Sequence, residues 1–338
     1  MPSNSATVTS SSLPTTEKGS SLWADAFTRL KKNKLAILGG IVVLLILIAC
    51  FIVTPILAAT GMDANAQDLS NQFAKPGSEK NLLGTDQLGR DMLMRVLKGG
   101  QISLLVAILS TLLTVTVGVI YGGIAGYVGG KTEAIMMRIV DGLLAMPFLI
   151  IVILFREMVS GHVDNAARSF LAFYEKTFEP EPESLNAFTT DVLSFTALIP
   201  LIVAIAAFGW LTMGRIVRTS AASLRRQEFV EAARSLGLSH RRILFRHILP
   251  NMLGPVIIYA TLTIPSFILY EATLSFIGLG IEPPNSSWGI LIKEGANFLE
   301  TYPIVLAIPA GLFSVTLFAF NFLGDGLRDA LDPKSSKD

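Results

Sequence analysis

The residues that could carry chemistry in this chain are few and scattered. Its three histidines and its single cysteine do not fall at the spacings that zinc sites require. The run GGKT at 129–132 invites comparison with a phosphate-binding loop, but that motif needs a glycine where Ala125 stands. No Ser-His-Asp, Cys-His or paired-carboxylate arrangement can be assembled within one loop. The sequence therefore predicts no enzyme, no metal, no cofactor, and no ATP hydrolysis by this chain.

Two acidic sites nevertheless stand out. Glu271 lies late in an apolar run, where a carboxylate is costly unless it faces protein, water or a partner charge. It has either a structural hydrogen-bonding role near the outer end or a role in a transport pathway. A second cluster, Asp86, Gly89, Arg90 and Asp91, precedes a helical stretch at 91–97. Local hydrogen bonds that fix a surface helix are the simplest interpretation of this cluster, and ligand contact is the alternative.

The elements that position these residues are membrane spans. The chain has 338 residues, of which 51% are hydrophobic and only 16% are charged, and its mean hydropathy is +0.57. A helix needs about 20 apolar residues to cross the hydrocarbon core. Six runs qualify, which predicts an all-α polytopic membrane protein with spans at 35–57, 102–127, 134–155, 195–213, 254–279 and 304–323.

The spans divide the chain into segments. A tail at 1–34, disordered to 21 and then helical and amphipathic, precedes the first span at 35–57. This run is long and begins late, so we expect a retained helix rather than a signal peptide. An external loop at 58–101, a five-span body at 102–327 and a tail at 328–338 follow. The body carries an external insert at 156–191, in which we expect a short helix at 165–176 and a proline-broken loop.

Charge sets the orientation. Lysines and arginines are about twice as frequent on one side of the spans as on the other. Both termini are therefore predicted to be cytoplasmic. Because 27 basic residues nearly balance 26 acidic ones, no global charge favours nucleic acid as a partner, and the lipid bilayer is the expected environment.

Small and special residues refine this picture. A glycine ridge in the second span predicts close helix packing, through Gly118, Gly122, Gly126 and Gly130. Prolines within the predicted spans should kink them, at positions Pro147, Pro200, Pro265 and Pro309. Trp288 and Tyr302 are candidates for the membrane interface.

The segment at 227–251 has the clearest pattern. Apolar residues recur at helical spacing, which places on one face Phe229, Ala232, Ala233 and Leu236. Gly237 suits the end of that helix, and Ser239 can cap a second, basic helix. The pattern predicts a helix-turn-helix that docks in a groove of another protein. The alternative is an amphipathic cytoplasmic loop that lies on anionic lipid.

The same segment resembles the EAA loop of membrane subunits of binding-protein-dependent ABC importers, which engages their ATPases. The resemblance rests on Glu231, Ala232, Ala233, Gly237, Ile248, Leu249 and Pro250, and it departs at His247, where isoleucine is usual. Four further stretches resemble the C-type subunit of the dipeptide and oligopeptide permease family: LKKNKLAILGG, LLGTDQLGRDMLMRVLKGGQISL, EATLSFIGLGIEPPNSSWG and GDGLRDALDP.

This resemblance implies a type I importer fold in the bacterial inner membrane. It implies a homologous B-type permease, two ATPases that carry the ATP and magnesium, and an extracytoplasmic solute-binding protein as partners. Di- or oligopeptides are the implied substrates, although relatives import nickel chelates or glutathione. The insert at 156–191 is longer than is usual in the family. The rival interpretation from another class is a channel or a structural membrane subunit.

Overall fold

The structure, a computed structural model, describes residues 22–78, 81–178, 181–281 and 285–331. Its regular elements are helices, and two isolated bridges, Ser78 with Asn81 and Thr85 with Asp91, are the only β pairings within these ranges. The all-α prediction is confirmed. The predicted tail at 1–21 lies outside the described residues, as does most of the predicted tail at 328–338, of which 328–331 are the end of a helix.

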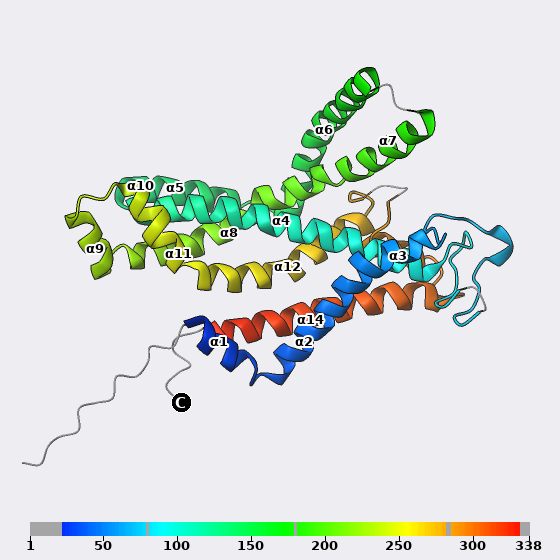
Figure 1. The fold of residues 1–338 in the computed structure, drawn as a ribbon, viewed down its shortest axis with the longest axis horizontal. Helices are drawn as coiled ribbons and strands as arrows, with labels where there is room; N and C mark the ends of the chain where they lie inside the picture. Colours follow the sequence, from blue (N-terminus) through cyan, green and yellow to red (C-terminus); the bar gives the residue numbers. More distant parts are fainter. Residues whose placement is uncertain (1–21, 79–80, 179–180, 282–284, 332–338) are drawn as a thin grey trace, which may run out of the picture.

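The elements follow one another in this order: α1 (Leu22–Leu30), α2 (Lys34–Ile48), a π-helical turn η1 (Ala49–Val53), α3 (Thr54–Ala59), a 3-10 turn η2 (Leu69–Asn71), α4 (Met92–Val128), α5 (Gly130–Leu144), α6 (Phe148–Phe178), α7 (Pro182–Thr196), α8 (Ile199–Leu224), α9 (Glu228–Ser235), α10 (His240–Ile243), a π-helical turn η3 (Leu244–Ile248), α11 (Leu249–Asn251), α12 (Leu253–Phe276), α13 (Trp288–Ala296) and α14 (Pro303–Leu331). Helices α4, α8, α12 and α14 run close to the long axis of the molecule, whereas α6 and α7 project from it (Figure 1).

The number of membrane spans equals the six predicted if one bent pair of helices counts as a single span. Within the described residues, five helical stretches are long and apolar enough to cross a membrane, and a bent pair makes a sixth if it counts as one span. The five are Lys34–Ala59, Met92–Val128, Pro182–Leu224, Leu253–Phe276 and Pro303–Leu331. The first predicted span thus corresponds to α2, η1 and α3 together.

The predicted span at 134–155 is wrong as a single straight helix. Two helices occupy this stretch, α5 and α6, and their axes differ by 94° across residues 145–147. Pro147 explains the break, because proline lacks a backbone N–H and disfavours helical geometry in the residue before it. The other three prolines for which kinks are predicted do not all lie inside helices. Pro200 lies in the first turn of α8, where no N–H is needed, whereas Pro265 and Pro309 lie inside α12 and α14.

The glycine ridge packs α4 against α8. A Cβ atom at Gly118, Gly122 or Gly126 would contact residues of α8, whereas at Gly130 it would meet open space. The prediction of a packing face is therefore confirmed for the first three glycines. Gly130 instead begins α5.

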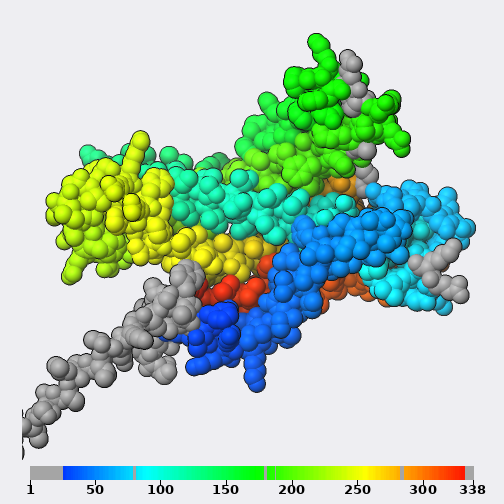
Figure 2. All heavy atoms as spheres, in the orientation of Figure 1, coloured from blue at the N-terminus to red at the C-terminus, as the bar shows by residue number. Residues whose placement is uncertain are grey.

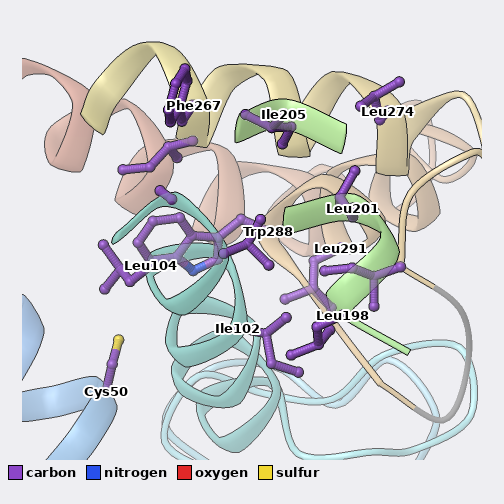
Figure 3. Packing of buried hydrophobic residues seen from close by; sticks show 14 of the residues in the cluster. Cys50, Ile102, Leu104, Leu198, Leu201, Ile205, Phe267, Leu274, Trp288 and Leu291 are labelled. Carbon is purple, nitrogen blue, oxygen red and sulfur yellow. The ribbon is translucent and has the colours of Figure 1, made fainter. Parts of the chain in front are cut away.

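The main core surrounds Trp288, which is fully buried (Figure 3). Its indole Nε1 donates to the backbone oxygen of Val96 at 3.0 Å. Figure 3 shows Leu104 beside the indole, with Phe267 on a neighbouring helix. The prediction that Trp288 anchors the chain at the membrane interface is wrong, because the indole ring is buried against Gly100 of α4, where a Cβ atom would overlap it. Tyr302 is 42% exposed.

The insert at 156–191 is more helical than the sequence indicates. In place of a short helix and a loop, α6 continues to Phe178 and α7 begins at Pro182. The two helices stand off from the rest of the molecule as a hairpin (Figure 2). Aromatic contacts close it, with the Tyr174 and Phe188 ring centroids 4.4 Å apart.

Candidate functional site

The segment at 227–251 folds as a helix, a sharp turn and a second helix at one end of the molecule (Figure 1). Gly237 makes the turn with φ of +76°, a conformation that residues with a Cβ atom adopt at a cost. The N–H of Leu238 donates to the carbonyl of Ala233 at 3.2 Å and closes α9. The side chain of Ser239 accepts from the N–H of Arg242 and caps α10.

The predicted apolar face of α9 divides into two parts. Ala233 is buried within the chain, together with Val230, which the sequence interpretation missed although the two lie three residues apart. Phe229 and Leu236 remain 40% and 79% exposed, and Ala232 is exposed between them. One face of α9 therefore holds the helix to the bundle, and an adjacent apolar face is not covered by any described part of the chain.

The inward face belongs to a second hydrophobic cluster, separate from the core around Trp288. Val230 and Ala233 join buried residues of the second helix, of which Ile243 and Ile248 are fully buried. These residues pack with α8 and with the end of α4, through the buried residues Tyr127, Met213, Val217 and Ala221. Close-packed side chains thus connect α9 and α10 to two of the spans.

Polar contacts reinforce this connection. The hydroxyl of Tyr127 lies 2.8 Å from Nδ1 of His240, and the guanidinium of Arg234 lies 5.5 Å from the centre of the Tyr127 ring. Arg225 donates to the backbone oxygen of Val128 at 2.9 Å. Sequence reasoning missed Tyr127 and Arg225, because neither residue type nor spacing marks them.

Glu231 lies in the first turn of α9 and is exposed. No described residue forms a hydrogen bond or ion pair with its carboxylate, which leaves it available to a partner. The second helix widens into the π-helical turn η3 directly before Pro250, whose ring cannot donate to the preceding turn. Leu249 is half-buried there and Pro250 is exposed. Nothing in the structure explains histidine rather than isoleucine at His247.

Glu271 lies at the other end of the molecule's core and is fully buried. The hydroxyls of Ser103 and Ser275 donate to its two oxygens at 2.6 and 2.7 Å. The Ser103 oxygen also accepts from the backbone N–H of Trp288 at 3.2 Å. Glu271 therefore ties α4, α12 and α13 together, and this geometry favours the structural alternative over the pathway role.

The cluster around Asp86 is also internal. Asp86 is 0% exposed and accepts from Arg90 at 2.7 Å and from Arg95 at 2.6 Å. Arg95 reaches Glu294 of α13 at 2.7 Å. Asp91 caps α4 by accepting from the N–H of Met94 at 2.8 Å.

The surface helix predicted at 91–97 is therefore wrong, because this stretch is the largely buried start of α4. Gly89 adopts φ of +71° beside the backbone of Asp68, so no larger residue fits there. The long-range contact with Glu294 could not be read from local spacing. We call the residues Asp86, Arg90, Arg95 and Glu294 the ionic clamp.

In the part of the chain that the structure describes, no group of three His, Cys, Asp or Glu side chains could hold a metal ion. The predicted site residues therefore fall into two places. Those of 227–251 gather at the α9 end, and Glu271 and the ionic clamp lie toward the α13 end.

Comparison with known proteins identifies the family. The profile described as "Binding-protein-dependent transport system inner membrane component" matches residues 118–337, and "N-terminal TM domain of oligopeptide transport permease C" matches residues 21–76. The chain is 41% identical to the oligopeptide transport system permease protein OppC of Haemophilus influenzae, over 94% of this chain and 90% of that protein.

Relatives from Bacillus subtilis give the same result. OppC of that organism is 39% identical over 95% of this chain and 92% of its own length, and the dipeptide transport system permease protein DppC is 38% identical over 92% and 85%. With matches of this extent, the chain belongs to the oligopeptide and dipeptide permease branch of the inner membrane components of binding-protein-dependent ABC transporters.

Proposed function

We propose that this chain is a permease subunit that imports di- or oligopeptides and is driven by ATP hydrolysis on separate subunits. It forms the pathway with a homologous B-type permease, and an extracytoplasmic solute-binding protein delivers the substrate. The relatives named for oligopeptide and dipeptide transport support the substrate class. Nickel chelates or glutathione are the alternative cargo.

The observation that carries the ATPase contact is the uncovered face of α9. Phe229, Ala232 and Leu236 form an exposed apolar stripe on a helix whose neighbouring face is buried. Exposed apolar stripes of this kind are binding surfaces. The unpaired carboxylate of Glu231 adds a polar contact beside the stripe, and Gly237 sets the angle between the two helices. Two ATPases that carry ATP and magnesium are the partners we assign to this surface in the assembled transporter.

The packing of the segment supports a mechanism. When the ATPases close, they displace α9, and the buried contacts of Val230, Ala233 and Ile243 carry this displacement to α8. Tyr127 carries it to α4 through His240. The coupling is a free-energy linkage between nucleotide binding and the orientation of the spans. This mechanism places the α9 end and both termini in the cytoplasm, as the charge distribution predicts.

Replacing the exposed stripe tests the proposal. Phe229→Asp with Leu236→Asp should abolish co-purification of the ATPases and peptide uptake in proteoliposomes, because two charges face an apolar groove. Leu69→Asp is the matched control, since Leu69 is 64% exposed far from α9. Normal co-purification and uptake by the double variant would overturn the proposal.

A further inference from the structure

A cavity of about 650 Å³ lies beside α9, between the last turns of α4 and α8 and the second helix of the 227–251 segment. Its lining comes from nine residues: Ile124, Tyr127, Val128, Arg225, Arg234, His240, Arg241, Leu244 and Phe245. This volume falls in the range of pockets that hold small ligands. We call it the basic cavity.

The basic cavity has an excess of positive charge. Within the described residues, no carboxylate forms an ion pair with Arg225, Arg234 or Arg241, and none lines the cavity. The acidic side chains of the neighbouring helix α5 are already engaged, Glu133 by Arg218 and Asp141 by Arg215. Three guanidinium groups around one hollow repel one another unless an anion lies between them.

Two of these arginines are held in place. Arg225 donates to the backbone oxygens of Tyr127 and Val128, and Arg234 lies over the Tyr127 ring. Because these contacts restrict both side chains before a ligand arrives, less side-chain entropy is lost on binding. The guanidinium group is also the side chain best suited to phosphate oxygens.

The other half of the cavity is apolar, and it lies toward the spans. Ile124 comes one helical turn before Val128 in α4, and Leu244 lies close to Gly123 of the same helix. Arg225, by contrast, lies beside Gly129, just beyond the end of α4. The cavity therefore has its apolar side toward the bilayer and its cations away from it. This polarity matches a phospholipid with its acyl chain toward the membrane.

We propose that the basic cavity binds one anionic phospholipid, with its phosphate held by Arg225, Arg234 and Arg241 and the start of an acyl chain against Ile124 and Leu244. A lipid held there contacts both α4 and the second helix of the 227–251 segment. Anionic lipid would then stabilise the position of that segment. The inference goes beyond the proposed function and depends only on the membrane location of the chain, so it can fail while the ATPase contact holds.

The test uses the full chain with its co-purifying subunits in phosphatidylcholine nanodiscs that contain a minority of photoactivatable phosphatidylglycerol. Mass spectrometry should locate the adducts in residues 124–128 and 244–245, and unlabelled phosphatidylglycerol should compete where phosphatidylcholine does not. Arg234→Gln with Arg241→Gln should lower adduct yield at these residues at least about tenfold, since each basic residue near the lipid contributes substantially to binding.

Two further variants separate charge from misfolding. Arg234→Lys with Arg241→Lys keeps the charge and should restore most of the adduct. Arg226→Gln with Arg242→Gln removes the same charge from exposed neighbours that do not line the cavity, and should change the yield less than about twofold. A drop in this control as large as in the cavity variant would show general attraction to the membrane surface and overturn the inference.

Three other results would also overturn it. Adducts spread evenly over the spans and unaffected by the cavity variant would mean that no site exists. Full displacement of the adducts by inorganic phosphate would identify a free anion rather than a lipid as the ligand. Loss of the adducts whenever the ATPases are bound would show that a partner side chain fills the cavity.

Discussion

The two ends of this protein differ in whether their charged side chains are paired within the chain. Toward the α13 end, Arg95 is 3% exposed and contacts both Asp86 and Glu294, so its charge is satisfied inside the chain. At the α9 end, Glu231, Arg234 and Arg241 have no ion pair with any described residue. Charged groups that are paired within the chain hold its elements together, whereas charged groups without a pairing partner and an uncovered apolar face are available for contacts with other proteins. The comparison separates the residues that maintain the fold from those that are left available to partners.

The largest effect is expected from breaking the ionic clamp. Arg95→Met leaves Asp86 and Glu294 with one shared arginine, and removing one partner of a buried ion pair costs about 3 kcal/mol or more. We expect a clear loss of thermal stability of the purified protein in detergent, measured as the unfolding midpoint. Arg246→Met, at an exposed position of the α9 end, should leave the midpoint nearly unchanged. Equal midpoints for both variants would remove the distinction between the two ends.

An intermediate effect is expected at Glu271. Glu271→Leu leaves the hydroxyls of Ser103 and Ser275 without their acceptor, which should cost about 2 kcal/mol of stability. Glu271→Gln keeps an acceptor of the same shape and should lose about half as much. It should also retain peptide uptake, since the carboxylate is fully buried within the chain and hydrogen-bonded to two serines. Loss of uptake by a stable Glu271→Gln protein would restore the pathway interpretation.

A substitution at Gly237 should have the smallest effect on stability. Its effect on the coupling of ATP hydrolysis to uptake should nevertheless be large. Valine there must adopt φ of +76°, at a cost of about 1–2 kcal/mol that is confined to an exposed turn. Gly237→Val should uncouple ATP hydrolysis from uptake in proteoliposomes, while the protein still inserts. Gly142→Val is the control, because Gly142 lies in α5 with open space around its Cβ position. Normal coupled uptake by Gly237→Val would contradict the role of the turn.

Local sequence signals predicted the features whose causes are local. Apolar length predicted the spans, and the spacing of Phe229, Ala232, Ala233 and Leu236 predicted a helix that ends at Gly237, where φ is positive. The same reasoning failed where distant segments decide the outcome. The prediction of Trp288 at the membrane interface is wrong because the burial of its ring depends on a segment far away in the chain, which includes Val96. The 94° break at Pro147 shows that a proline within an apolar run can end a helix rather than bend it.

The site divides in the same way. The residues from Glu231 to Pro250 could be singled out by periodicity and by resemblance, since they are contiguous. Tyr127 and Arg225 connect this segment to the bundle from the ends of two other helices. No sequence pattern predicts these contacts. Glu294 completes the ionic clamp from 199 residues beyond Arg95. Contacts at such separations follow from the tertiary fold and not from local spacing.

The most direct test of the account is chemical cross-linking from the exposed face of α9. Leu236→Cys provides a reactive thiol at a position that is 79% exposed, and the native Cys50 is fully buried and should stay unmodified. A thiol-reactive photoprobe on this residue should cross-link the protein to a nucleotide-binding ATPase in native membranes, and the yield should change when ATP is added. The same probe on Leu69→Cys should give no such product. Failure of the Leu236→Cys protein to capture an ATPase, with or without ATP, would contradict the central claim.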